Sequence, residues 1–115
     1  MDDKQFERLA FDELDGIEEA LGAVDGVDVD LAGGILTIEF EAGPKVVVNS
    51  HSAARQIWVA ANLAAAHFSP DPKTGRWFDS KTGQDLWDRL RSILTDRLGH
   101  PVKLARATSP RSSPP

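Results

Sequence analysis

The spacing of the apolar residues changes twice along this chain, and that change restricts the fold more than any other feature. Residues 3–21 repeat apolar side chains every three or four positions, as one buried face of a helix requires. Between residues 27 and 79 the spacing falls to two, which is typical of strands with one buried face. Residues 82–98 return to the helical spacing. The sequence therefore predicts the order helix, strands, helix.

Both predicted helices have recognisable ends and an apolar stripe. Asp2 or Asp3 can accept the free N–H groups at the start of the first helix, and Gly22 is placed to end it. Thr82 and Asp85 have the spacing of a capping box, so we expect the second helix to start at Thr82. The first stripe consists of Phe6, Leu9, Ala10, Leu14, Ile17 and Leu21. The second consists of Leu86, Trp87, Leu90, Ile93, Leu94 and Leu98.

Six stretches between the helices are predicted to be strands. They cover residues 27–31, 36–41, 46–48, 56–60, 66–68 and 76–79. Short glycine-containing turns at 32–34 and 42–44 favour an antiparallel meander. Such a sheet buries one face, and two helices with one apolar stripe each can cover it. We therefore predict an α+β fold, a two-layer α/β sandwich with an antiparallel sheet of about six strands and both terminal helices on one face.

The composition fits a single domain. We expect residues 1–105 to form it and the Ser/Pro/Arg-rich residues 106–115 to be a disordered tail. The chain has no cysteine, which excludes disulfides, thiolate zinc sites, protein-held iron–sulfur clusters and cysteine nucleophiles. Its first residues lack the pattern of a signal peptide, and no apolar stretch is long enough to span a bilayer. We expect a cytoplasmic protein that does not bind membranes.

Charge is distributed unevenly along the chain. Residues 1–30 hold eleven acids and two bases, a net charge of −9, whereas the rest of the chain holds eleven bases and seven acids, a net charge of +4. This asymmetry predicts one electronegative region on a nearly neutral body. It argues against nucleic acid as a partner, because the phosphates would be repelled.

The acids are predicted to gather along one edge of the fold. A helix that turns directly into an antiparallel edge strand would bring together five carboxylates, which we call the acidic rim: Glu18, Glu19, Asp25, Asp28 and Asp30. Such oxygen ligands suit hard cations, Fe²⁺, Fe³⁺, Mn²⁺, Ca²⁺ or Mg²⁺. The spacing is not that of an EF-hand and the rim has no histidine, so we expect weak binding at several sites. The alternative is a solvated acidic face that keeps the protein soluble.

Trp58 is the second candidate. If Ile57 and Val59 face the core, Gln56 and Trp58 face the opposite side of the sheet, as Asp28 and Asp30 do. An outward tryptophan is typical of a binding hot spot. The alternative is that the strand has the opposite phase and Trp58 is core. Trp77 and Trp87 are expected to be core residues.

The sequence contains no recognisable catalytic constellation. Ser50, His51 and Ser52 are neighbours, but no oriented Ser–His–Asp arrangement follows from them. His67 and His100 are interpreted as structural or exposed residues, not as ligands. The Gly33-Gly34 pair is followed by a predicted strand, not a helix, so it does not indicate a phosphate loop.

Taken in order, these residues resemble the bacterial frataxin (CyaY) family over residues 3–105. The resemblance rests on Phe6-x-x-Leu9-Ala10, Ile17-Glu18-Glu19-x-Leu21, Asp25-Gly26, Asp28-x-Asp30, Gly33-Gly34-x-Leu36-Thr37-Ile38-x-Phe40, 45–49, Gln56-Ile57-Trp58-Val59-Ala60, His67-Phe68, Trp77, Asp79, Thr82-Gly83, Leu86-Trp87 and Leu90. It implies a sheet covered on one face by two terminal helices. It also implies weak iron binding and docking on the cysteine desulfurase and the scaffold protein of iron–sulfur cluster assembly.

The resemblance assigns roles to individual residues. Iron-binding acids are expected at Glu18, Glu19, Asp25, Asp28 and Asp30, with Asp3 and Glu7 as outlying members. Partner contacts are expected at Trp58, Gln56, Asp15, Glu19 and Asp28. The chain departs from the usual pattern of the family at three places. Gly22-Ala23 interrupts the run of acids after the first helix, Glu7 stands where some relatives have a histidine, and Ala65-Ala66 or its neighbours replace a glycine pair.

The leading hypothesis is a monomeric, non-enzymatic protein that binds iron and regulates or supplies cluster assembly. The first alternative is an iron-storage or ferroxidase-type detoxification protein that forms oligomers with iron. The second is an acidic adaptor with no role for a metal.

Overall fold

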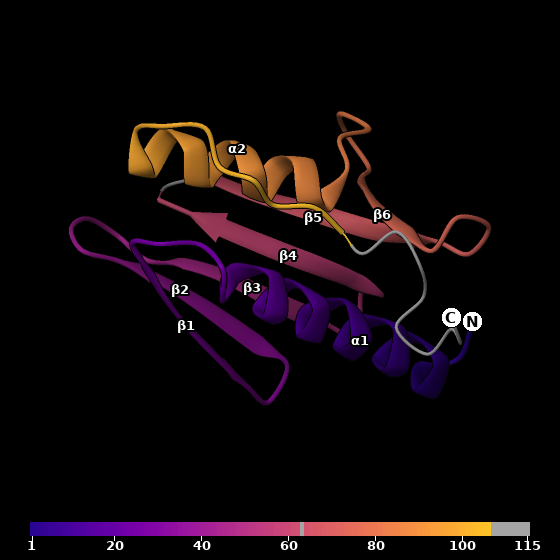
Figure 1. The fold of residues 1–115 in the computed structure, drawn as a ribbon. Coiled ribbons are helices and arrows are strands. Elements are labelled where there is room, and N and C mark those ends of the chain that lie inside the picture. The colour runs from indigo at the N-terminus through magenta and orange to yellow at the C-terminus, as the bar shows by residue number, and fades with distance from the viewer. Residues whose placement is uncertain (63, 107–115) are drawn as a thin grey trace, which may run out of the picture.

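The computed structural model of the protein describes residues 1–62 and 64–106. Its elements follow the predicted order, as Figure 1 shows. They are α1 (Asp3–Leu21), β1 (Val27–Ala32), β2 (Ile35–Phe40), β3 (Val46–His51), β4 (Gln56–Ala61), β5 (Ala64–Asp71), β6 (Arg76–Asp79) and α2 (Leu86–Leu98). The six strands form one sheet in the order β1-β2-β3-β4-β5-β6, and every neighbouring pair is antiparallel.

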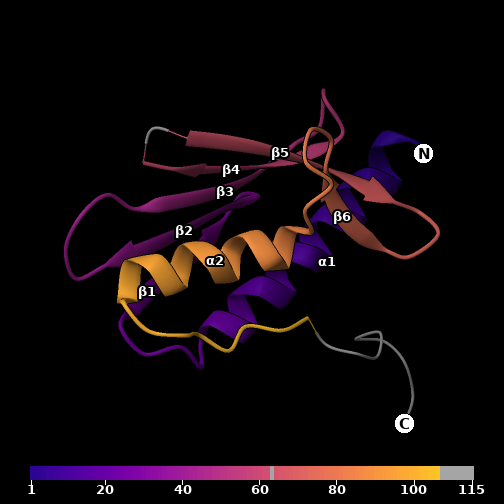
Figure 2. The ribbon, with the colours of Figure 1, turned by 90° about the horizontal axis from the view of Figure 1, so that it is seen from above.

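Both helices lie on the same face of the sheet, so the predicted two-layer sandwich is confirmed (Figures 1 and 2). We call the other face the open face. The inward side chains of the strands, among them Leu36, Ile38, Ile57 and Phe68, are at most 1% exposed and form one core with the stripes of both helices. Neither described helix is long and apolar enough to cross a membrane.

The β1–β2 hairpin has the tightest turn of the meander. Gly33 and Gly34 are its two loop residues, and both have positive φ, 60° and 79°. A two-residue hairpin turn of this kind requires positive φ at both positions, which glycine adopts without a steric penalty. The turn fixes the register of the strands, so that Asp28 lies opposite Glu39 and Asp30 lies opposite Thr37.

β5 is longer than the sequence predicts. It runs from Ala64 to Asp71, whereas the prediction covers only residues 66–68. Alanine has low strand propensity and proline cannot donate to a neighbouring strand, so the local sequence gives a weak signal. Hydrogen bonding to β4 on one side and to β6 on the other extends the strand.

The two helix starts differ in how well they were predicted. Asp2, one of the two predicted caps, is the N-cap of α1, and it also forms a capping box with Gln5 that was not predicted. The capping box expected at Thr82 is wrong, because α2 starts at Leu86 and Asp85 is its N-cap. The Asp85 carboxylate accepts from the backbone N–H groups of Trp87 and Asp88, at 2.8 and 3.3 Å. An aspartate directly before an apolar run caps the helix by itself.

One member of the predicted α1 stripe is misplaced. Leu9 is 38% exposed, whereas Glu13 is only 7% exposed. At 3.6 residues per turn, position 9 lies about a quarter turn from the centre of the stripe and position 13 lies closer to it. The other five predicted stripe residues of α1 are buried, as are Trp77 and Trp87.

The chain after α2 packs back onto the helices (Figure 2). Val102 and Leu104 are 8% and 2% exposed, and Arg91 Nη1 donates to the carbonyl oxygen of Leu104 at 2.9 Å. Arg106, the first residue of the predicted tail, donates to Glu13 and to the carbonyl oxygen of Gly75. Residues 107–115 lie outside the described residues, so the disordered tail stays a prediction.

Candidate functional site

The acidic rim follows from the path of the chain between α1 and β1. Glu18 and Glu19 lie in the last turn and a half of α1, Asp25 lies in the turn after it, and Asp28 and Asp30 lie on β1. β1 is an edge strand of the sheet. Because Val27, Val29 and Leu31 pack against the core, Asp28 and Asp30 point to the open face.

The rim carboxylates are spread out and accessible to solvent. Glu18 is half-buried, and Glu19, Asp25, Asp28 and Asp30 are exposed. Glu19 has an interaction partner, but the other four form no ion pair within residues 1–62 and 64–106. In the same residues, no three His, Cys, Asp or Glu side chains are close enough together to hold one metal ion. The rim is therefore an open anionic surface.

Glu39 extends the rim and was missed in the predicted site. It is exposed, it lies on β2 and it directly faces Asp28 across the β1–β2 pair. Two like charges at directly opposite positions of a sheet destabilise the pair. The signal was present in the sequence, because a two-residue turn at Gly33-Gly34 fixes this register.

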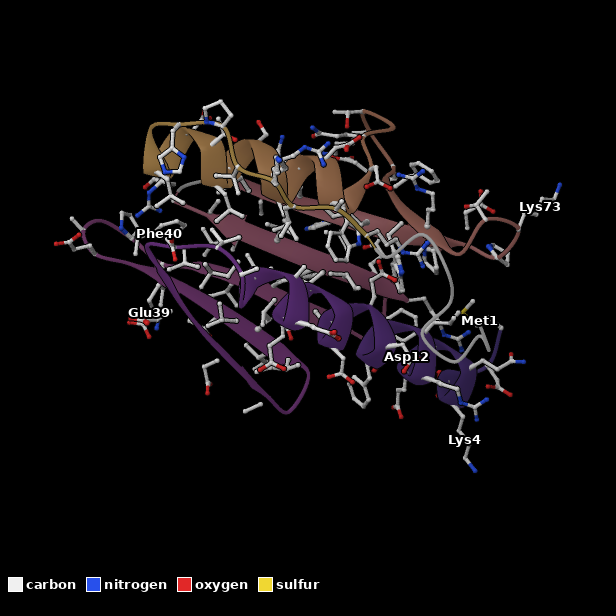
Figure 3. All side chains as sticks on the ribbon, viewed as in Figure 1. Met1, Lys4, Asp12, Glu39, Phe40 and Lys73 are labelled. Atoms are coloured by element: carbon white, nitrogen blue, oxygen red, sulfur yellow. The ribbon has the colours of Figure 1, made fainter. Side chains whose placement is uncertain are left out.

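Asp3 and Glu7 do not join the rim. Asp3 is fifteen residues before Glu18 on the same helix, which corresponds to about 22 Å along its axis. Its carboxylate accepts from Arg55 Nη2 at 2.8 Å, so it already has a cationic partner. Figure 3 shows Glu39 at the side of β1 and β2, far from Met1 and Lys4 at the start of α1. The role of Asp3 and Glu7 as iron ligands stays a prediction, and these two residues would form a site separate from the rim.

Asp15 lies on α1 between the Asp3 and Glu7 pair and the rim residues Glu18 and Glu19. It is exposed on α1, four residues before Glu19. Like charges with this spacing face each other on a helix and destabilise it slightly. Gly22 and Ala23 follow at the end of the helix, so α1 reaches the turn at Asp25 without a further acid.

The open face also carries Trp58, so the predicted phase of β4 is correct. Ile57 and Val59 are 0% and 2% exposed on the helix-covered side, and Trp58 points the other way. The indole is half-buried, because an imidazole lies on each of its faces. Trp58 Nε1 donates to Gln56 Oε1 at 3.0 Å.

The two imidazoles belong to His51 and His67. Their centroids lie 3.9 Å and 4.3 Å from that of Trp58, with interplanar angles of 10° and 17°. Sequence reasoning missed this stack. The alternation of the strands places all three residues on one face, but only the register of β3, β4 and β5 places them side by side.

Comparison with known proteins identifies the fold family. A family model of the frataxin-like domain matches residues 1–100. The chain belongs to this family. Its structure is similar to that of the frataxin from Psychromonas ingrahamii, a CyaY-family protein, with a TM-score of 0.84 and 27% sequence identity. That match covers 92% of this chain and 100% of the other.

Frataxins from the yeast Saccharomyces cerevisiae are also similar. A trimeric yeast frataxin with its full-length N-terminus has a TM-score of 0.61 and 28% identity, covering 79% of this chain and 76% of the other. A trimeric yeast frataxin in complex with ferrous iron has a TM-score of 0.56 and 26% identity, covering 84% and 85%. The predicted family and fold are confirmed by these matches.

Proposed function

We propose that this frataxin-like protein binds iron weakly at its acidic rim and regulates, or supplies iron to, iron–sulfur cluster assembly by docking on the cysteine desulfurase and its scaffold protein. The observation that carries the proposal is that two unlike features share the open face. Asp28, Asp30 and Glu39 make one end of it anionic, and Trp58 forms an aromatic centre three strands away.

The charges favour a basic partner surface. Neighbouring carboxylates repel one another and raise the free energy of the folded protein. A cluster of them at one edge therefore favours a binding role over a role in stability. A basic patch on the desulfurase would relieve the repulsion and speed up association. Trp58 would contribute apolar contact area in the residue type that is enriched at binding hot spots.

The same carboxylates support weak iron binding. Hard cations prefer oxygen ligands, and exposed carboxylates leave much of the hydration shell of the ion in place. The structure of a yeast frataxin with ferrous iron supports this assignment, since that protein belongs to the same family. Iron and the desulfurase would then compete for, or share, the rim.

Charge reversal tests the docking. Asp28→Lys/Asp30→Lys should weaken binding to the desulfurase by about tenfold or more at low salt, since like charges at an interface cost several kcal/mol. Asp12→Lys/Asp96→Lys is a matched control, because it changes the net charge equally at exposed positions outside the rim. Binding of the wild type should also decrease as salt is added. Equal binding by the rim variant and the control would refute docking through the rim.

A paramagnetic titration tests the metal site. Adding Mn²⁺, or Fe²⁺ without oxygen, to ¹⁵N-labelled protein should first broaden the amide signals of residues 18–30 and of Glu39. The Asp28→Lys/Asp30→Lys variant should lose the effect on β1. Uniform broadening over all exposed acids, including Asp96, would show that the rim has no preference for the ion.

The alternative function is iron storage with ferroxidase activity. The observation in its favour is that the similar yeast frataxins are trimeric, one of them with ferrous iron. It predicts that this protein consumes oxygen when Fe²⁺ is added and elutes as growing oligomers. A monomeric elution profile under aerobic iron, with no oxygen consumption, would rule out storage and leave the docking proposal intact.

A further inference from the structure

The centre of the open face is a stack of three aromatic rings. His51 lies on β3, Trp58 on β4 and His67 on β5, three neighbouring strands of the sheet. The ring centroids are 3.9 Å and 4.3 Å apart, and the planes are within 17° of parallel. Each face of the indole is therefore covered by an imidazole.

The pairing of the strands builds this stack. Trp58 lies directly opposite His67. On the other side Trp58 faces Asn49, and His51 is the diagonal neighbour two residues further along β3. Directly opposite and diagonal positions on one face of a sheet are within reach of aromatic side chains.

The stacking axis runs across the strands, and this determines what a partner would meet. Neighbouring strands are about 4.8 Å apart, which is close to the spacing of the three rings. Rings stacked along that direction stand upright on the sheet and present their edges, not their faces, to solvent. A partner would therefore meet the edge of the Trp58 indole.

Hydrogen bonds fix the rotation of the indole within its plane. Trp58 Nε1 donates to Gln56 Oε1 at 3.0 Å, and Gln56 Nε2 donates to Ser69 Oγ at 3.2 Å. The indole is thus held by two ring contacts and by one hydrogen bond to a side chain that is itself anchored on β5.

We propose that His51 and His67 are positioning residues of the docking surface, which hold Trp58 between them so that its indole edge meets the partner in one orientation. This inference rests on the proposed docking function. It adds His51 and His67 to the proposed docking surface, as residues that affect the partner through Trp58.

The surroundings of the histidines support positioning over a role in the core. His67 is exposed and His51 is half-buried, and both lie on the face opposite the apolar core. No described residue forms a hydrogen bond with His51 Nδ1. The imidazole of His51 instead stacks on Trp58, with 3.9 Å between the ring centroids.

An indole that is already held in place loses less conformational freedom when a partner binds. Immobilising one side chain at an interface weakens binding by a factor of roughly 3 to 10. Removing both imidazoles takes away the two ring contacts and leaves the hydrogen bond to Gln56, so the indole can tilt over the sheet. The loss should therefore appear in affinity for the partner and not in the stability of the core.

The experiment measures desulfurase affinity for Trp58→Ala, His51→Ala/His67→Ala and His51→Phe/His67→Phe. The exposed His100, which lies beyond α2, provides the control variant His100→Ala. We expect the double alanine variant to bind about 3- to 10-fold more weakly than the wild type. The double phenylalanine variant keeps two flat rings beside the indole and should regain most of the affinity, whereas His100→Ala should bind like the wild type.

NMR provides a readout that needs no partner. The ring current of the indole should shift the imidazole proton signals of His51 and His67, and Trp58→Ala should remove both shifts without affecting His100. Absence of these shifts in the wild type would refute the stack in solution and leave docking through the rim untouched.

Three binding results would overturn the inference. If Trp58→Ala weakens binding but the double alanine variant does not, Trp58 docks without positioning. If phenylalanine fails to restore affinity, the imidazole nitrogens act on the partner directly. If Trp58→Ala itself binds like the wild type, the proposed docking role of Trp58 fails, and the positioning role fails with it.

Discussion

The acidic rim and the buried carboxylate of Glu13 place the same chemical group in opposite surroundings. Glu13 is 7% exposed, and its Oε2 accepts from Trp87 Nε1 at 2.6 Å. The Arg106 guanidinium binds the same carboxylate in a bidentate manner. Its Nε donates to Oε2 at 3.1 Å and its Nη2 donates to Oε1 at 3.2 Å. In the rim, by contrast, the exposed Asp28 on β1 lies directly opposite the exposed Glu39 on the neighbouring strand β2.

The difference separates carboxylates that stabilise the fold from carboxylates that are available for binding. The Glu13 cluster connects α1 to α2 and to the segment after α2, since Trp87 and Arg106 lie 74 and 93 residues from Glu13. A buried charge is tolerated only when it is paired and hydrogen-bonded, and this one is both. Rim carboxylates repel one another, and the proposed ligand or partner would compensate for this repulsion.

The largest expected effect is at Glu13. Glu13→Ala should lower the free energy of unfolding by about 3 kcal/mol, because it leaves the buried Trp87 N–H without its acceptor and breaks the pair with Arg106. Chemical denaturation monitored by circular dichroism measures the loss. Glu13→Gln keeps an acceptor for the indole and should lose less. A Glu13→Ala variant as stable as the wild type would contradict the separation between the two regions.

The second effect is at Asp85, the buried N-cap of α2. Asp85→Ala should cost about 1–2 kcal/mol, since it removes the acceptor for two backbone N–H groups. Asp85→Ser retains a capping oxygen and should recover most of this in thermal melts. Arg76 Nε also donates to Asp85 Oδ2 at 3.0 Å, but Arg76 is 47% exposed. Arg76→Ala should therefore lower the free energy of unfolding by less than Asp85→Ala does.

The third effect depends on pH. Asp79 accepts from the backbone N–H groups of Lys81 at 2.7 Å and Thr82 at 3.3 Å, and the Lys81 hydrogen bond is the main reason why the pKa of Asp79 lies below its ordinary value of 3.8. A group with a lowered pKa in the folded state stabilises the protein above the unfolded pKa. This contribution decreases as the pH falls through the folded pKa.

Asp79→Asn is the variant that isolates this contribution. The difference in free energy of unfolding between wild type and Asp79→Asn should be largest near neutral pH and should shrink below about pH 4. Urea denaturation at a series of pH values measures it. A difference that is independent of pH would show that the charge of Asp79 is not what stabilises the β6–α2 connection.

The smallest effect has the opposite sign. Asp28→Asn/Glu39→Gln should raise the free energy of unfolding by up to about 0.5 kcal/mol at low salt, because it removes a directly opposed pair of like charges. Added salt should abolish the gain through screening. Glu7→Gln/Asp96→Asn removes the same charge outside the rim and serves as the reference. A destabilised rim variant would show that the rim supports the fold.

Much of the fold was predictable because it follows from local patterns. The change in apolar spacing gave both helices and all six strands, and Gly33-Gly34 gave the first hairpin. The error at β5 arose where contacts from other strands decide, because the strand extends from Ala64 through pairing with both of its neighbours. The error at α2 was local, because the Asp85 carboxylate caps the first turn and Thr82 lies before the helix.

The candidate site was predictable to a similar extent. Strand alternation correctly placed Asp28, Asp30 and Trp58 on the open face. The buried Glu13 was read as one more acid of the electronegative region, because its partners Trp87 and Arg106 are 74 and 93 residues away. No local pattern indicates an acid whose counter-charge lies that far along the chain.

The sequence by itself thus determined which residues share a face, because side-chain direction follows from the period of the local backbone. It determined the carboxylates of β1 and the outward indole of Trp58. Only the tertiary structure decided which residues on a face touch. The register of β3, β4 and β5 placed Trp58 between His51 and His67, and helix packing buried Glu13 beside Trp87 and Arg106. Such contacts join segments whose distance in space is set by packing and pairing over the whole domain.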